Sequence, residues 1–331
     1  MAWTIYRNTD ASAPILTGQS GSLITLFDAV LVNGYGSQPA AGWSKPYTFS
    51  SSFGAVYYPS ASAASKMYYR INDSGNLTAS LPQRFATIQG FENMISAASG
   101  SLRVPDLSPN TNEVKIVKSN TSDAVVRPWI IAADEKTCML FTGVFDTTAS
   151  VSQAVWVSHY FGEIYPYKEN DAYHSVIVGV GTSLNSTYTN TEIYLTQHTY
   201  TFLSSSYTGN GIWIMRSYDE FPLYDQCGLI SPSALRDSYI GELPRLNPAE
   251  GGLYTTDIWV VGNYPNYNIR GKIRGLKAHL HSENGWPTNY ALSYNGTGTQ
   301  LGRRFEMIDL LCRTTSPTAY YYVLETSNTV E

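Results

Sequence analysis

The chain has 331 residues, and its 21 lysines and arginines against 26 aspartates and glutamates give a formal net charge of −5. Charged residues make up 14% of the sequence and hydrophobic residues 43%, which excludes intrinsic disorder and provides for a large core. With a pI near 5.6 and no block of basic residues, the chain lacks the electrostatic surface of a nucleic-acid-binding protein. We therefore expect a folded protein with no nucleic-acid partner.

The N-terminal sequence and the cysteines indicate synthesis in a cytoplasm and no membrane partner. Residues 1–7 lack the basic and apolar segments of a secretory signal. The apolar stretch at residues 23–32 is far shorter than the about 20 residues of a membrane span. The cysteines are too far apart in sequence to define a disulfide framework or a zinc site. We expect no metal, no cofactor and three reduced thiols, at Cys138, Cys227 and Cys312.

One amphipathic helix is predicted near the N-terminus, over residues 22–32. Apolar residues recur there at positions 23, 26, 27, 30 and 31, the spacing of a helix that packs on one face. Ser20 or Ser22 is suited to cap its start, and Asn33-Gly34 is suited to end it in the left-handed conformation. A helix about 16 Å long is unstable alone and must pack on a sheet.

The rest of the chain is predicted to be β, because apolar and aromatic segments alternate with clusters of Gly, Pro, Asn and Ser. Residues 128–132 and 137–141 flank a polar turn and are predicted to form a hairpin. The fold class we expect is mainly β, with α+β character at the N-terminus: packed antiparallel sheets or a sandwich with one short amphipathic helix. Further strands are predicted at residues 66–71, 155–161, 175–180, 192–196, 211–215, 257–261, 276–281, 305–311 and 320–324.

A polar stretch interrupted by prolines, residues 99–123, suggests a domain boundary near residue 125. This divides the chain into an N-terminal α+β module, residues 1–125, and a β-rich module, residues 126–331. One continuous domain is the alternative.

Histidines do not define a metal site in the sequence. His279 and His281 are two residues apart, so on a strand both would project from one face, but no third ligand lies nearby. A solvent-facing or interface role is therefore favoured for both. His159 alternates with apolar residues and is predicted to be a hydrogen-bonded core or interface histidine.

Acidic pairs offer the chemistry of a glycosidase, which needs two carboxylates about 5–10 Å apart. The candidates are Asp134 with Glu135, Asp219 with Glu220, and Glu163 with Asp171. Adjacent residues of a strand point to opposite faces, which disfavours the first two pairs. The sequence also lacks a GxSxG elbow, a Walker loop and an HExxH segment. An active site built on an acid pair is therefore disfavoured.

The sequence offers more candidates for interface contacts than for catalysis. Arg270, Lys272 and Arg274 alternate, which places three cations on one strand face, either guarding an edge strand or meeting an acidic neighbouring subunit. Among 26 tyrosines, consecutive ones such as Tyr57-Tyr58 and Tyr68-Tyr69 would turn one ring to the core and the other outward, where it favours protein or glycan interfaces. The interface candidates are Tyr264, Tyr267, Arg270, Lys272, Arg274, His279 and His281.

Residues 26–46 carry a family resemblance. A short helix ends there in Asn33-Gly34-Tyr35-Gly36, and the element Ala41-Gly42-Trp43 follows. This resembles the opening of a family of tailed-bacteriophage virion structural proteins. Later segments are also similar to that family, namely residues 67–73, 86–92, 161–164, 167–168, 171–173, 247–254 and 274–281.

The resemblance implies a non-enzymatic component of a phage particle, made in the host bacterial cytoplasm and located in the virion. Its partners would be copies of itself and other virion proteins, in the tail, the neck or the outer capsid surface. A glycan-binding or glycan-cleaving tail component is the alternative, using outward aromatics such as Trp286, Tyr290 and Tyr294 with an acid pair and a host-surface glycan as partner. A bacterial surface adhesin is disfavoured, because export needs a signal that residues 1–7 lack.

Overall fold

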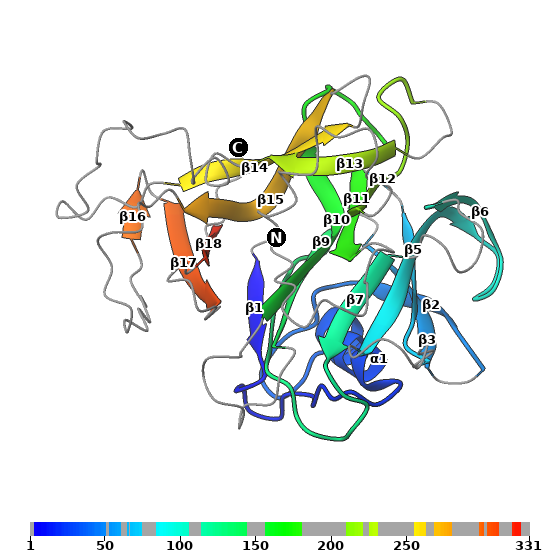
Figure 1. Ribbon diagram of the computed structural model, residues 1–331, viewed down its shortest axis with the longest axis vertical. Coiled ribbons are helices and arrows are strands. Elements are labelled where there is room, and N and C mark those ends of the chain that lie inside the picture. The colour runs from blue at the N-terminus through cyan, green and yellow to red at the C-terminus, as the bar shows by residue number, and fades with distance from the viewer. Residues whose placement is uncertain are drawn as a thin grey trace.

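The computed structural model describes residues 3–50, 53–60, 65, 67–74, 84–105, 114–143, 156–180, 210–220, 225–230, 255–262, 268–279, 298–300, 303–310 and 320–325. Within these residues the fold is mainly β, with antiparallel strands in two sheets and one short helical segment, as predicted. In Figure 1 the second sheet lies to the upper left, and the first sheet with the helix lies below and to the right. No helix in the described part of the chain is long and apolar enough to cross a bilayer.

The first sheet holds the N-terminal strands. Its paired strands follow the orders β2–β3–β4–β5–β7 and β11–β10–β9–β8–β1. The pairing of Lys115 in β7 with Val180 in β11 joins the two series. β6 pairs with β5, and β12 pairs with β11. The strands are β1 (Thr4–Arg7), β2 (Ser44–Thr48), β3 (Gly54–Tyr58), β4 (Tyr68–Asn72), β5 (Arg84–Met94), β6 (Gly100–Val104), β7 (Val114–Ser119), β8 (Trp129–Ala133), β9 (Thr137–Gly143), β10 (Trp156–Pro166), β11 (Ser175–Val180) and β12 (Asn210–Ile214).

The second sheet runs β13–β14–β15–β18–β17–β16. Two strands belong to both sheets. β10 pairs with β9 and β11 up to Glu163 and then with β15 from Ile164 to Pro166. β13 likewise leaves β12 for β14 after Gln226. The strands are β13 (Asp225–Ile230), β14 (Thr255–Gly262), β15 (Ile269–His279), β16 (Gly298–Gln300), β17 (Arg303–Leu310) and β18 (Tyr320–Glu325).

Most predicted strands correspond to observed ones. The predicted hairpin is β8–β9, and the other predicted strands correspond to β4, β10, β11, β12, β14, β15, β17 and β18. Residues 192–196 lie outside the described residues. The polar stretch 99–123 contains two strands that were not predicted, β6 and β7. Strands from both sides of residue 125 pair, β1 with β8 and β7 with β11, and the boundary there stays a prediction.

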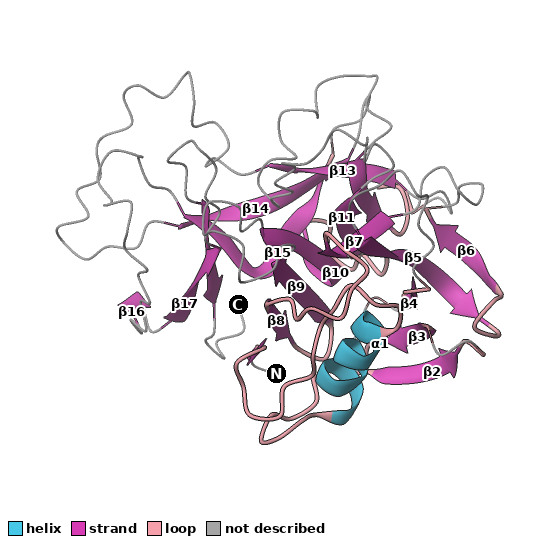
Figure 2. Ribbon diagram, turned by 60° about the horizontal axis from the view of Figure 1, so that its bottom comes forward, coloured by secondary structure: helices cyan, strands magenta, loops and turns pink. Residues whose placement is uncertain are grey.

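The predicted helix is present as α1 (Ser22–Phe27), continued by a π-helical segment η1 (Asp28–Asn33). All five residues of the apolar stripe are fully buried. Gly34 follows with φ +76° and ψ 169°, so the helix ends where predicted and at a glycine with positive φ, but not in the left-handed helical conformation. Figure 2 shows the helix lying beside β3, at one side of the strands.

The predicted capping by Ser20 or Ser22 is wrong. Gly21 occupies the cap position in a left-handed conformation, and no side chain of the helix's own start caps it. The N–H of Leu23 instead donates to the Asp73 carboxylate at 3.0 Å, while the Ser22 hydroxyl donates to the carbonyl of Thr17 at 2.8 Å. Because Asp73 is 50 residues away in sequence, local spacing could not reveal this contact.

The first core centres on the Phe161 ring of β10. Its centroid lies 5.6 Å from Phe27 of the helix, 5.6 Å from Trp43 and 5.3 Å from Tyr69 of β4. Aromatic pairs at such separations add to the free energy of burying the rings themselves. The helix, the segment leading into β2 and the first sheet therefore all pack on one residue of β10.

The next residue, Gly162, lets β10 bend from the first sheet into the second. Its φ of +134° lies in a region that other residues rarely adopt. A Cβ there would lie 2.5 Å from the carbonyl oxygen of Lys136 and 2.6 Å from the Cα of Thr137. The close approach of β9 therefore requires glycine at this position.

We expect Gly162→Ala to lower the free energy of unfolding by more than about 3 kcal/mol, because backbone strain and a backbone clash act together. Gly42→Ala is the control: Gly42 also has a positive φ, of +94°, but a Cβ there meets only one side-chain atom, at 3.7 Å. Its expected loss is about 1–2 kcal/mol. Urea unfolding compares the two variants, and equal losses would contradict the role of the close approach.

Replacing Phe27 by Asp places a carboxylate in the aromatic core, and we expect a loss of at least about 4 kcal/mol or failure to fold. Thr25→Asp is the matched control, because Thr25 lies on the exposed side of the same helix. Thermal unfolding followed by circular dichroism measures both. A Phe27→Asp variant as stable as Thr25→Asp would contradict the packing of the helix.

Candidate functional site

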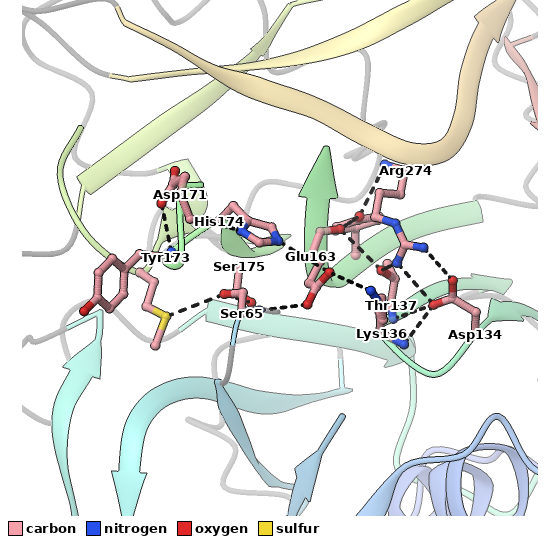
Figure 3. A network of polar contacts seen from close by, with 12 residues as sticks. Ser65, Asp134, Lys136, Thr137, Glu163, Asp171, Tyr173, His174, Ser175 and Arg274 are labelled. Carbon is pink, nitrogen blue, oxygen red and sulfur yellow. Dashed lines mark hydrogen bonds and ion pairs between the residues drawn. The ribbon is translucent and has the colours of Figure 1, made fainter. Parts of the chain in front are cut away.

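A buried polar cluster lies where β10 passes between the sheets (Figure 3). We call it the junction network. It gathers side chains from β9, β10, β11 and β15, from the turns β8–β9 and β10–β11, and from the segment between β3 and β4. Its members are Ser65, Asp134, Lys136, Thr137, Glu163, Asp171, His174, Ser175 and Arg274.

Glu163 is the centre of one half of the network. Its Oε1 accepts the backbone N–H of Ser65 at 2.9 Å, and its Oε2 lies 3.4 Å from His174 Nε2 and 3.7 Å from Lys136 Nζ. The other ring nitrogen of His174 contacts the carbonyl oxygen of Asp171. Both nitrogens of this ring therefore face oxygen atoms.

The pKa of Glu163 is lowered from its ordinary value of 4.5. Burial alone would raise it, but the hydrogen bonds from His174 and Ser65 and the positive charges of His174 and Lys136 together outweigh burial. Glu163 is thus held as a carboxylate by its neighbours. This is the opposite of the raised pKa that a general acid needs near neutral pH.

Asp134 is the centre of the other half and lies in the turn between β8 and β9. Its Oδ1 accepts the N–H of Thr137 at 2.8 Å and its Oδ2 meets Arg274 of β15 at 2.8 Å. Arg274 also donates to the Thr137 hydroxyl at 2.8 Å, and the Trp43 indole N–H donates to the Asp134 carbonyl at 2.7 Å. Asp134 thus connects the segment leading into β2, the hairpin turn and the second sheet.

The predicted acid pair Glu163 and Asp171 is brought into one network, but both residues are 4% exposed. Asp171 accepts the N–H of Tyr173 at 2.8 Å and lies 3.4 Å from Arg270. Carboxylates occupied in this way are suited to fixing backbone geometry rather than to protonating a glycosidic oxygen. Of the other predicted acids, Glu220 pairs with Lys168 at 2.6 Å on the surface.

The predicted cations of β15 do not guard an edge, and that expectation is wrong. β15 has partners on both sides, with β14 on one and β10 and β18 on the other. Arg270 is 2% exposed, pairs with Asp171 and donates to the carbonyl of Arg216 at 2.6 Å. Lys272 lies 3.5 Å from Asp257, and Arg274 pairs with Asp134.

Lys272 and Arg274 nevertheless border a surface. Lys272 Nζ and the Arg274 guanidinium lie 5.6 Å and 5.4 Å from the ring centroid of Tyr165, which is 42% exposed. Tyr167, at 66%, and Ile269, at 43%, are exposed near the adjoining ends of β10 and β15. We call these five residues the Tyr165 surface. Sequence reasoning missed Tyr165 and Tyr167, although their alternation within Ile164–Tyr167 was the available signal.

The consecutive tyrosines of β3 and β4 place one ring in the core and the other outward, as predicted. Tyr57 and Tyr69 are fully buried, whereas Tyr58 and Tyr68 are only partly buried. The rings of Tyr58 and Tyr68 lie 4.3 Å apart at 33°. We call these two residues the outward tyrosine pair, a second aromatic area on the first sheet.

The remaining predicted residues lie either inside or outside the described part of the chain. His159 is confirmed as a core histidine that accepts the N–H of Val117 at 3.1 Å, and Cys138 and Cys227 are buried free thiols. His279 ends β15 opposite Thr255. No cluster of three or more metal-ligating side chains occurs in the described ranges. The predicted residues outside the described part of the chain are Tyr264, Tyr267, His281, Trp286, Tyr290, Tyr294 and Cys312.

Comparison with known proteins adds no family name. No model of a known protein family matches the chain. A search of curated proteins also finds no match.

The lowered pKa of Glu163 predicts a specific pH dependence. An acidic group whose pKa is lower in the folded state than in the unfolded state stabilises the protein above its unfolded-state pKa. This contribution is lost as the pH falls through the folded-state pKa. We expect the wild-type chain to lose stability as the pH falls below about 4.5. Glu163→Gln should be less stable at neutral pH by about 2 kcal/mol and should show a smaller slope of stability against pH in this acid range.

Urea unfolding at a series of pH values measures this slope. Asp219→Asn is the control for removing one negative charge, because Asp219 is exposed. A slope for Glu163→Gln equal to that of wild type would show that the junction network does not hold the charge of Glu163.

Proposed function

We propose that this protein is a non-enzymatic structural component of a tailed-bacteriophage particle, acting through protein–protein interfaces in the virion after synthesis in the host cytoplasm. The proposal rests on where the segments that resemble that virion family lie in the fold. In the described residues, these segments build the core and the junction between the sheets.

The opening motif illustrates this. Gly34 ends the helix, and the Tyr35 hydroxyl donates to Asp10 at 2.8 Å. Trp43 packs on Phe161 and donates to the Asp134 carbonyl. These contacts fix the entry of the chain into β2, so the motif determines the fold rather than a reaction.

The later segments act in the same way. In residues 161–164, Phe161 fills the first core, Gly162 permits the bend and Glu163 joins the junction network. In residues 274–281, Gly275 has φ +67°, and a Cβ there would lie 2.5 Å from the Trp3 ring. The resemblance includes positions such as Gly162 and Gly275, where a side chain would clash with neighbouring residues. This supports an architecture shared with the virion proteins.

The two aromatic areas supply surfaces for partners. Tyrosines present a large contact area at low entropic cost, which is why they are enriched at interfaces. The outward tyrosine pair lies on the first sheet and the Tyr165 surface lies where β10 meets β15 in the second, so two neighbours could be contacted at once. Copies of this chain and other virion proteins are the proposed occupants.

Mass spectrometry of purified particles of the encoding phage tests the proposal, and we expect the chain among the particle proteins. Light scattering of the isolated chain should give the mass of an oligomer, a multiple of 36.6 kDa greater than one chain. Tyr58→Ser with Tyr68→Ser should lower that multiple while leaving the circular dichroism spectrum unchanged, and Thr25→Ser, on the exposed side of the helix, is the surface control. Particles that lack the chain would contradict the proposal.

Glycan binding at the host surface is the second candidate, and the Tyr165 surface is the observation that favours it. Two exposed rings two residues apart, Tyr165 at the end of β10 and Tyr167 directly after that strand, can stack on sugar rings. Binding of host polysaccharide that is lost in Tyr167→Ala but kept in Tyr58→Ser would favour this candidate. Sugar release that is abolished in Glu163→Gln would favour the glycan-cleaving form, against the burial of Glu163.

A further inference from the structure

A lysine and an aspartate are in direct contact inside the first sheet. Asp73 directly follows β4 and Lys118 belongs to β7, so the two residues come from the strands on either side of β5. Lys118 Nζ lies 2.5 Å from Asp73 Oδ1, and the two side chains are 1% and 0% exposed. The junction network does not include this pair.

The surroundings hold both groups in place. The N–H of Leu23 donates to Asp73 Oδ2 at 3.0 Å, at the side of the carboxyl group away from the lysine contact. Lys118 Nζ also donates to the carbonyl of Gln19 at 2.5 Å and lies 3.4 Å from the Ser22 hydroxyl. Nζ is therefore fixed next to the carboxyl group, and Oδ2 already has a hydrogen-bond donor.

Burial disfavours the charged forms of both groups. It raises the pKa of Asp73, although the contact with Lys118 opposes this, and it lowers the pKa of Lys118. The neutral acid and the neutral amine are the forms that react with each other. An ion pair in such a place also carries a large desolvation cost, which a single neutral amide would avoid.

We propose that Lys118 and Asp73 condense into an intramolecular amide bond between Nζ and Cγ. The Nζ lone pair attacks Cγ, and the Leu23 N–H stabilises the negative charge that develops on Oδ2, as a donor in an oxyanion hole does. The bond from Cγ to Oδ1 then breaks, and Oδ1 leaves as water with the acid proton and one proton from the amine. No oxidant, reductant or cofactor is needed, because the step is a condensation.

The bond would connect β4 to β7 across β5 and would also fix the chain that leads into α1. A cross-link between distant residues restricts the unfolded chain and thereby favours the folded state. The proposal concerns the chemistry of this pair and does not rest on the proposed function.

Intact mass spectrometry of the full-length folded chain under denaturing conditions tests the proposal. We expect a mass lower than that of the sequence by one water molecule, and a branched peptide after proteolysis that contains both Lys118 and Asp73. A full mass with the two residues in separate linear peptides, after prolonged incubation of the folded chain, would overturn it.

Two lysine variants separate the cross-link from loss of water elsewhere, such as a cyclic imide at an aspartate. Lys118→Met should restore the full mass expected for its sequence and slow migration on a denaturing gel relative to wild type. Lys115→Met, on the same strand, should keep both the loss of water and the faster migration. A Lys118→Met chain that still loses water would overturn the proposal. If that variant folds poorly, the peptide map of the wild-type chain still tests independently whether Lys118 and Asp73 are joined.

Discussion

The structure depends on the bend of β10 at Gly162. In four consecutive residues this strand places Phe161 in the first core, turns at Gly162, directs Glu163 into the junction network and inserts Ile164 into the second core. Close contact with the β9 hairpin leaves no room for a side chain at the turn. The position of each sheet is therefore set by one backbone conformation, and the polar residues around it hold that conformation.

The junction network balances the cost of burying charge. Removing ions from water is expensive, so buried charges are stable only where partners and hydrogen bonds replace the lost hydration. Glu163 and Asp134 meet this condition with backbone N–H groups as well as cations. Because the partners come from segments far apart in the sequence, the network specifies how those segments come together more than it adds stability.

Local patterns predicted local structure well. The apolar stripe at residues 23–31 gave the helix, and the alternating segments gave most of the strands, because both depend on near neighbours in sequence. The alternation of the consecutive tyrosines between core and surface was predicted for the same reason. Tertiary contacts decided the rest: Asp73 caps the helix from 50 residues away, and β15 acquires acidic partners from other elements of its own chain. The alternating cations of β15 showed where charge lay but not which acids would meet it.

The sharing of β10 and β13 between the sheets has a mechanical consequence. A flexible linker between two layers would let one swing relative to the other. Here the connection consists of continuous strands that are hydrogen-bonded on both sides of the crossing point. A force that pulls the two layers apart must therefore shear several ladder hydrogen bonds together instead of extending a loop, so the molecule transmits load as a stiff body.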